Sequence, residues 1–275
     1  MSAIVAVFPS GSIVSSEVSE SLLRDKNVEV LMGISSNGAY EDRTDPDSFN
    51  ILVNNAPDIT DSELLWKSFW KSLPVQPTHL ILTNDSTVSW ASRMRACKVW
   101  SEDMRIMAPP SAINDIAFNK LKTYKFWPDI SPRLYPDSDV KQWYVKPVIS
   151  NSTIGRRYID EVEAAKLHEH KDLVVCEGLD ENAPEYIVEC YGKELIGCRS
   201  REKLVGGLGA LTRAGEVTTG VKMIFEKLRE FMSGYEAPWF FQVKADRLLE
   251  LKPRISGAGG SYRLFHGKNV HFSHG

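Results

Sequence analysis

Side chains with complementary chemistry stand close together in two predicted strands in the last quarter of the sequence. The three residues Ala245-Asp246-Arg247 are predicted to form the loop between these strands, so that Lys244 pairs with Leu248. Counting back from that pair places Gln242 directly opposite Glu250. Directly opposed residues share one face of a hairpin, so the side-chain oxygens of these two residues are expected to converge.

The alternation of side chains along the second strand extends this polar face. A period of two puts Glu250, Lys252 and Arg254 on one side, whereas Leu249 and Leu251 point into a core. The glycine-rich run at 256–260 suits a turn that exposes its backbone, where proteins often hold anions. A solvated sheet face would show a similar pattern, so the residues alone leave both interpretations open.

The segment that begins at Glu250, Glu-Leu-Lys-Pro-Arg-Ile-Ser-Gly, resembles the Glu-x-Asn-Pro-Arg-x-Ser-Gly motif of ATP-grasp enzymes. The likeness is to the branch that includes carbamoyl-phosphate-synthetase-like and amino-acid ligases. It implies that Glu250 and Gln242 hold one or two Mg²⁺ ions, or Mn²⁺, against the phosphates of ATP, and that Arg254 steadies the transferred phosphoryl group. One position departs from the motif. Lys252 replaces the metal-binding asparagine, and a charged ammonium group cannot ligate a cation.

Further segments resemble other elements of the ATP-grasp domain, in the order of that family. Asn119-Lys120 and Val145-Lys146-Pro147 resemble the two segments whose lysines contact phosphate. The loop 150–156 stands where the family has a flap, 174–179 resembles the adenine-binding hinge, and 185–189 resembles the strand whose first glutamate takes the ribose hydroxyls. The nucleotide-binding residues implied are Lys120, Lys146, Ser150, Ser152, Gly155, Glu177, Gly178, Leu179 and Glu185.

The resemblance runs from about Ser111 to Asn269, where Gly267-Lys268-Asn269 resembles the closing Gly-x-Asn. A basic pair, Arg199 and Arg201, stands where the family often has one, and either arginine could bind the carboxylate of a substrate through its bidentate fork. A surface arginine pair is an equal alternative. The catalytic residues implied are Arg254, Lys252 and Arg201.

Residues 1–110 alternate strand-like and helix-like segments, which predicts a parallel sheet covered by helices. The resemblance implies that this sheet is the Rossmann-like domain that precedes an ATP-grasp domain. Pro9-Ser10-Gly11-Ser12 has one glycine where a dinucleotide fingerprint needs three, so an ordinary turn is favoured. Pro109-Pro110 is the expected boundary. The predicted strands are Ala3–Phe8, Val28–Gly33, His79–Thr83 and Arg105–Ala108, and the predicted helices are Ser15–Arg24 and Thr60–Leu73.

Residues 111–275 contain helices and strands in blocks, which indicates α+β lobes. A two-lobed ATP-grasp domain is expected, with one lobe at about 111–184 and the other at about 185–275. The predicted helices are Ile113–Phe126, Tyr158–Lys171 and Val221–Met232. The predicted strands are Trp143–Val148, Asp172–Cys176, Glu185–Tyr191, Glu194–Arg199 and the hairpin.

Net charge, hydropathy and cysteine spacing exclude several kinds of partner and site. The net charge is -3 and no run of Lys or Arg stands out, so no nucleic-acid partner is expected. No apolar stretch approaches the roughly 20 residues of a membrane helix. The four cysteines form no Cys-x-x-Cys pair, which favours a reduced, cytoplasmic compartment without structural zinc. A homodimer is left open.

The resemblance implies an ATP-dependent biosynthetic ligase that joins a small carboxylate substrate to an amine or similar nucleophile through an acyl phosphate. The alternative is a catalytically weak or inactive member of the family that binds nucleotide as a regulatory subunit, because of Lys252. The identity of the carboxylic acid is not encoded in any recognisable motif.

Overall fold

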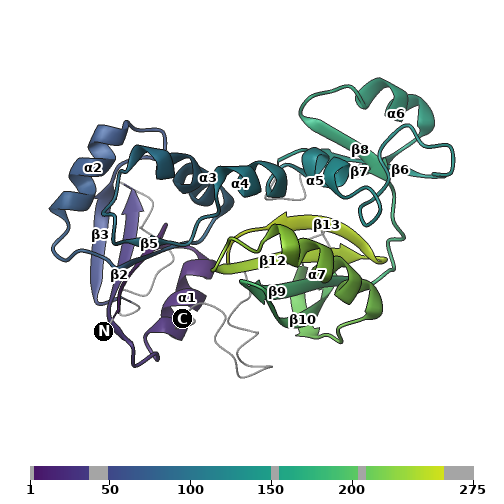
Figure 1. The fold of residues 1–275 in the computed structure, drawn as a ribbon. Coiled ribbons are helices and arrows are strands. Elements are labelled where there is room, and N and C mark those ends of the chain that lie inside the picture. Colours follow the sequence, from purple (N-terminus) through teal and green to yellow (C-terminus); the bar gives the residue numbers. More distant parts are fainter. Residues whose placement is uncertain (1–2, 37–48, 150–154, 204–208, 257–275) are drawn as a thin grey trace. The chain divides into compact units, whose positions relative to one another are not determined.

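The computed structural model describes residues 3–36, 49–149, 155–203 and 209–256 (Figure 1). The chain divides into two compact units. Unit 1 contains Met1–Ser111 with the short segments Tyr235–Trp239 and 253–256, and unit 2 contains Ala112–Gly234 and Phe240–Lys252. No helix in the described part of the chain is long and apolar enough to cross a membrane.

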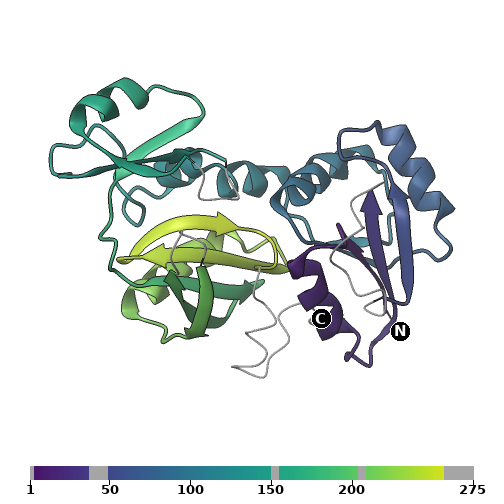
Figure 2. The ribbon, with the colours of Figure 1, turned by 180° about the vertical axis from the view of Figure 1, so that it is seen from behind.

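Unit 1 is built on a five-stranded parallel sheet of order β3-β2-β1-β4-β5. The strands lie between α2 on one face and α1 on the other (Figures 1 and 2). This arrangement confirms the helix-covered parallel sheet expected from the sequence. The strands are β1 (Ala3–Phe8), β2 (Val28–Ser36), β3 (Ile51–Ala56), β4 (His79–Leu82) and β5 (Arg105–Ile106). The helices are α1 (Ile13–Leu22), α2 (Glu63–Ser72), α3 (Asp85–Met94) and the 3-10 turn η2 (Arg95–Cys97).

Aromatic side chains form the core between α2, α3 and the sheet of unit 1. The rings of Trp66 and Trp90 lie 4.3 Å apart between centroids, and Phe8 packs edge-on against both. Helix α2 begins later than the predicted Thr60, because the side chains of Thr60 and Asp61 form hydrogen bonds with Asp58 in the preceding turn, and the cap is Ser62. On α2, Trp66, Phe69 and Trp70 are buried, whereas Leu64 and Leu65 are exposed.

The first part of unit 2 contains a three-stranded antiparallel sheet of order β7-β6-β8. Two predicted helices need correction. The helix expected at 113–126 is broken into two, because Asn119 leaves the helix and caps the second one. Tyr158 lies in a strand that pairs with Tyr144, so the next helix begins only after its cap at Asp160. The elements are α4 (Ser111–Ala117), α5 (Lys120–Phe126), β6 (Trp143–Pro147), β7 (Arg157–Ile159), α6 (Glu161–Leu167) and β8 (Leu173–Glu177).

The second part of unit 2 is a five-stranded sheet of order β11-β10-β9-β12-β13, against which α7 packs (Figure 1). The apolar stripe of α7, with Val221, Ile224, Phe225 and Leu228 buried, explains why this helix forms where it was predicted. The elements are β9 (Glu185–Tyr191), β10 (Glu194–Lys203), β11 (Gly209–Ala214), α7 (Thr219–Phe231), β12 (Pro238–Lys244) and β13 (Arg247–Lys252).

The hairpin β12–β13 has the predicted partners but a different turn. Ala245 and Asp246 form a two-residue turn, each with positive φ (48° and 55°), and Lys244 pairs with Arg247 and not with Leu248. One residue farther along, Val243 pairs with Leu248, and the register then shifts. This bulge restores the predicted opposition of Gln242 and Glu250. The bulge therefore compensates for the shorter turn, and the pairing of Gln242 with Glu250 is the predicted one.

The bulge and the end of β13 change two expected side-chain positions. Leu249 is the extra residue of the bulge, so its predicted place in the core is wrong. It is half-buried and lines the cavity described below. The strand ends at Lys252, so the alternation that was expected to carry Arg254 onto the face of Glu250 stops two residues short.

Candidate functional site

A cavity of about 270 Å³ lies in unit 2 and is lined by residues of both its sheets. The three-stranded sheet contributes Tyr144 and Lys146 from β6 and Cys176 and Glu177 from β8. The five-stranded sheet contributes residues of three strands, β9, β12 and β13. The remaining lining residues are Pro132, Arg156, Tyr158, Leu179, Glu181, Glu185, Gln242, Lys244, Leu249 and Glu250.

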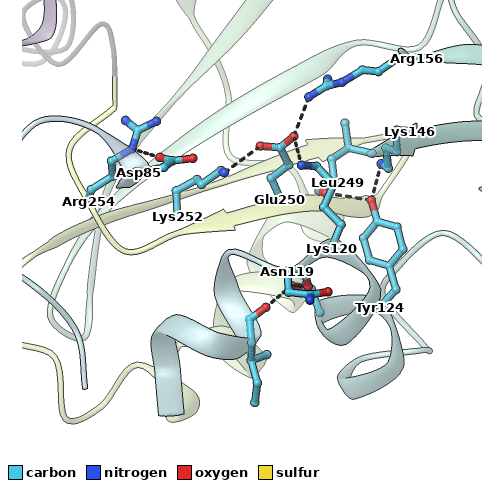
Figure 3. Close-up of polar contacts among 12 residues, drawn as sticks. Asp85, Asn119, Lys120, Tyr124, Lys146, Arg156, Leu249, Glu250, Lys252 and Arg254 are labelled. Atoms are coloured by element: carbon cyan, nitrogen blue, oxygen red, sulfur yellow. Dashed lines mark hydrogen bonds and ion pairs between the residues drawn. The ribbon is translucent and has the colours of Figure 1, made fainter. Parts of the chain in front are cut away.

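A buried carboxylate, that of Glu250, is the centre of a cluster of cations. Lys120 Nζ lies 3.4 Å and Arg156 Nη2 lies 3.1 Å from Glu250 Oε1, and Lys252 Nζ lies 3.6 Å from Oε2. Figure 3 shows these three side chains reaching the carboxylate from different parts of unit 2. Lys146 is the fourth cation near enough to act on Glu250.

Burial and the neighbouring charges act together on the pKa values of Glu250 and Lys120. Burial by itself would raise the pKa of Glu250, but the charges of Lys252, Lys120, Arg156 and Lys146 together lower it to about 2. Burial lowers the pKa of Lys120 to about 8, against the favourable charge of Glu250 and with the repulsion of the other cations. Glu250 is therefore ionised at neutral pH.

Local structure explains how Lys120 and Lys146 are held. The Asn119 side chain accepts the Lys122 N–H and starts α5, which places Lys120 in its first turn. Tyr124 lies one turn later on the same helix face. Its hydroxyl accepts a hydrogen bond from Lys146 Nζ and donates one of 2.8 Å to the Leu249 carbonyl (Figure 3). The ammonium group of Lys146 also lies 4.9 Å from the centroid of the Tyr124 ring.

Other residues of the cavity give it an acidic end. Glu177, Glu181 and Glu185 line it, and Lys244 Nζ donates to the Glu181 carbonyl at 2.9 Å. Burial raises the pKa of Tyr158 to about 12, with Glu181 and Asp180 adding to the effect, whereas the charges that act on Glu250 are all cations. The cavity is thus polarised between a cationic region around Glu250 and an acidic region near Tyr158.

The segment Glu177-Gly178-Leu179 follows β8 and is held by hydrogen bonds of its backbone. Gly178 N–H donates to the Gln142 carbonyl at 2.8 Å, and the Tyr158 hydroxyl donates to the Leu179 carbonyl at 2.6 Å. A Cβ atom at position 178 would come within 2.8 Å of the Tyr158 ring. Glycine is required here because Tyr158 packs directly on the backbone.

The donors around Glu250 are a poor match for a resident divalent cation. Its two carboxylate oxygens already face an arginine and two lysines, and Gln242 opposite offers only a neutral amide oxygen. In the part of the chain that the structure describes, no group of three or more His, Cys, Asp or Glu residues could hold a metal. The pairing of Gln242 with Glu250 as metal ligands stays a prediction, and the fixed cations disfavour it.

Most of the site residues expected from the sequence come together in unit 2. Lys146, Glu177, Leu179, Glu185, Gln242 and Glu250 line the cavity, Gly178 lies between two of them, and Lys120 and Lys252 contact Glu250. Gly155 is exposed with a positive φ of 76°. Ser150, Ser152 and the side chain of Arg201 lie outside the described residues.

Two expected arginines have other partners. Arg254 belongs to unit 1, where its Nε donates to the carboxylate of Asp85 and its Nη1 donates to the Ile255 carbonyl at 2.7 Å. Arg199 is buried and its Nη2 lies 3.2 Å from Glu189 Oε1 on the neighbouring strand. Neither contact tests the catalytic roles that the resemblance implies.

Sequence reasoning did not assign two residues of the site, Tyr124 and Arg156. Tyr124 carried a usable signal, because it stands four residues after Lys120 in a predicted helix and so shares its face. Arg156 ends the polar loop that resembles the flap, but its contact with Glu250 spans 94 residues of sequence. No local pattern predicts a contact of that range.

Searches of family models and of curated proteins found no match to this chain. Solved structures do match. The L-amino acid ligase from Bacillus licheniformis superposes with a TM-score of 0.68 at 12% identity, over 98% of this chain and 72% of that one. The chain has the ATP-grasp fold. The parallel sheet of unit 1 and the two sheets of unit 2 are parts of this fold.

Two further ATP-grasp structures were solved with nucleotide. The biotin carboxylase domain of 2-oxoglutarate carboxylase from Hydrogenobacter thermophilus, in complex with MgADP, ADP and bicarbonate, matches with a TM-score of 0.70 at 10% identity, over 98% of this chain and 68% of that one. The N5-carboxyaminoimidazole synthetase from Staphylococcus aureus, complexed with ADP, matches with a TM-score of 0.66 at 11% identity, over 98% and 76%. Identities this low establish the fold alone.

Proposed function

We propose that this protein is an ATP-dependent ligase that joins a carboxylate to an amine or a related nucleophile through an acyl phosphate. The observation that carries the proposal is the polarised cavity of unit 2. Burying several cations beside one carboxylate is costly unless an anion completes the cluster, and the polyphosphate of a nucleotide supplies that anion. The ATP-grasp fold and the names of the similar structures, a ligase, a biotin carboxylase domain and a synthetase, support the same class.

The nucleotide is oriented by the two ends of the cavity. Lys120, Lys146 and Arg156 bind the phosphates at the cationic end, where charge-assisted hydrogen bonds are strongest. At the other end the carboxylate of Glu185 accepts hydrogen bonds from the ribose hydroxyls, and the backbone of Glu177-Gly178-Leu179 receives the base. Ser150, Ser152 and Gly155 form the flap in this proposal.

A carboxylate must be activated before a nucleophile can displace one of its oxygens, because oxide is a poor leaving group. An oxygen of the substrate carboxylate attacks the γ-phosphorus of ATP, the bond to the β–γ bridging oxygen breaks, and ADP leaves. The nucleophile then attacks the acyl carbon and inorganic phosphate departs. Because the fixed cations disfavour a metal at Glu250, the transferred charge is stabilised here by Lys120, Lys146 and Arg156.

A second candidate has a specific observation in its favour. Lys252 contacts Glu250 where the resembling motif has a metal-binding asparagine, and a protein altered in this way could bind nucleotide without transferring phosphate. In that case the chain is a nucleotide-binding or regulatory subunit. Both candidate functions require that nucleotide binds in this cavity, but only the ligase converts ATP to ADP.

One set of measurements tests both candidates. Thermal-shift titrations with ATP and with ADP should raise the melting temperature of the wild type and of Lys98→Gln, a control that changes an exposed lysine paired with Glu102. Lys146→Gln should lose the shift. ADP release across a panel of amino acids and small carboxylates, each with an amine acceptor, then identifies a ligase. Binding without ADP release supports the regulatory subunit, and no binding of either nucleotide contradicts both.

A further inference from the structure

The side chain of Lys252 is buried and is fixed by contacts with Glu250 and Phe118. Only 4% of its surface is exposed, its Nζ lies 3.6 Å from Glu250 Oε2, and the same atom lies 5.0 Å from the centroid of the Phe118 ring. The backbone beneath it is fixed as well, because Lys252 pairs with Phe240 in the hairpin. An ammonium group with a carboxylate beside it and an aromatic ring near it is held as a fixed positive charge.

Glu250 divides its two oxygens between two sets of cations. Oε1 receives Lys120 and Arg156, and Oε2 receives Lys252. A magnesium ion binds a carboxylate oxygen at about 2 Å, so an ion on Oε2 would share that oxygen with the ammonium group of Lys252. The repulsion between the two charges in this buried place opposes the ion. Lys252 therefore occupies the position in which a divalent cation would serve Glu250.

An ammonium group can replace a magnesium ion in part. It contributes one positive charge and N–H donors that can reach phosphate oxygens, but it cannot bridge two phosphates with octahedral geometry. With Lys120, Lys146 and Arg156 it gives unit 2 four fixed cations beside one carboxylate. A group of cations placed in this way suits a nucleotide that arrives without a metal ion.

We propose that Lys252 is a built-in counter-ion for the nucleotide polyphosphate, so that this protein binds free nucleotide without a divalent cation. The inference rests on the proposed nucleotide site and adds to it how the phosphate charge is neutralised. It also assigns Lys252 as the residue that determines metal dependence. Replacing its ammonium group by a carboxamide restores an oxygen beside Glu250 and removes the competing charge.

The test is isothermal titration of ADP into the 275-residue protein, once with EDTA and once with MgCl₂. For the wild type we expect ADP to bind in EDTA at least as tightly as in MgCl₂, because Mg²⁺ that binds free ADP competes with the protein for it. For Lys252→Asn we expect binding in EDTA to weaken by about tenfold or more, the usual loss for a charged hydrogen bond, and to be restored by MgCl₂. Lys98→Asn, which alters an exposed lysine, should behave like the wild type.

A second readout follows the metal itself. Electron paramagnetic resonance of Mn²⁺ added with ADP should show no more bound Mn²⁺ with the wild type than ADP alone binds, and additional bound Mn²⁺ with Lys252→Asn. If Lys252→Asn does not fold, the EDTA and Mn²⁺ measurements on the wild type still decide whether this protein binds nucleotide without a divalent cation.

The outcomes separate the two proposals. Wild-type binding that requires MgCl₂, or protein-bound Mn²⁺ in the wild type, overturns the role of Lys252 and leaves the nucleotide site standing. A Lys252→Asn variant that folds and binds ADP in EDTA like the wild type also overturns that role. No binding of ADP under either condition overturns the nucleotide site and the inference together.

Discussion

At the scale of single residues, the cluster around Glu250 makes the charge of Lys120 sensitive to pH. Burial and the neighbouring cations lower the pKa of this lysine to about 8. A bound polyphosphate favours the protonated form and raises that pKa. Below about pH 8 Lys120 is already charged, whereas above it a proton must be taken up on binding.

Affinity for ADP should therefore be full below about pH 8 and should fall as the pH rises through that value. Isothermal titration across this range, in two buffers of different ionisation enthalpy, measures both the affinity and the proton uptake. Lys120→Arg keeps its charge at all these pH values and should flatten the profile. A wild-type affinity that stays constant up to about pH 10 would contradict the assignment.

Tyr124 links Lys146 to the backbone of β13, and its removal should disturb both. In Tyr124→Phe the Lys146 ammonium loses its acceptor and the Leu249 carbonyl loses its donor. The expected loss in the free energy of unfolding is about 1–3 kcal/mol, as for other buried polar groups left without a partner. Urea denaturation measures it, with Tyr186→Phe, on the half-buried surface of β9, as the matched control. Equal stability of the two variants would show that the hydroxyl bonds contribute nothing.

At the scale of elements, the turn of the β12–β13 hairpin is coupled to the start of α7. Gly220 lies so close to this turn that a Cβ atom there would come within 2.0 Å of Asp246 Oδ1 and 2.9 Å of Asp246 Cβ. Asp246 also has a positive φ, which glycine adopts at no steric cost. The glycine in the helix and the aspartate in the turn therefore restrict each other.

Gly220→Ala should destabilise the protein by about 1–3 kcal/mol, because overpacking outweighs the gain in helix propensity. In an Asp246→Gly background the clash is absent, and Gly220→Ala should then be neutral or stabilising. Chemical denaturation of the two single variants and the double variant gives the coupling energy. Additive effects would show that the turn and the helix do not contact each other as described.

Sequence reasoning missed the edge strands β3, β7 and β11 and the helix α3. β3 and β11 lie at the edges of their sheets. The burial of β3 is mixed, with Asn54 and Asn55 exposed, so its sequence lacks a clear period of two. By contrast, Glu185–Tyr191 was predicted to the residue, and five of the seven residues of this central strand are buried. Local patterns thus identify an element when its burial is regular.

At the scale of the whole molecule, the cysteines report on the two units separately. Cys176, Cys190 and Cys198 are buried in unit 2, and burial raises the pKa of all three thiols, that of Cys198 to about 11. Cys97, in unit 1, is partly exposed. Since the thiolate is the reactive form, the three buried thiols should react with iodoacetamide only when unit 2 opens.

Nucleotide should therefore protect the thiols of unit 2. At an ADP concentration of about 100 times its dissociation constant, labelling of Cys176, Cys190 and Cys198 should slow by about 100-fold, because only the folded unit binds the ligand. Labelling of Cys97 should change little. Mass spectrometry of labelled peptides follows each thiol. Equal protection of Cys97 would show that the two units open together.

The sequence alone determined those features that depend on neighbouring residues. The opposition of Gln242 and Glu250 was correct although the predicted turn was one residue too long, because a bulge compensated for it. The parallel sheet of unit 1 and the hairpin of unit 2 also followed from local alternation and from the order of the segments. These predictions hold because backbone pairing and side-chain alternation act over a few residues.

The tertiary structure decided which charges meet at Glu250. Lys120 lies on α5, and Arg156 lies 94 residues before Glu250 in the sequence. Packing of the chain in unit 2 brings both side chains onto one oxygen of the Glu250 carboxylate. It also separated Lys252 from Arg254, which stand two residues apart and were expected on one face. The strand ends between them, so Lys252 stays with Glu250 and Arg254 pairs with Asp85 in unit 1. Contacts of this range depend on how the elements pack, which no local pattern encodes.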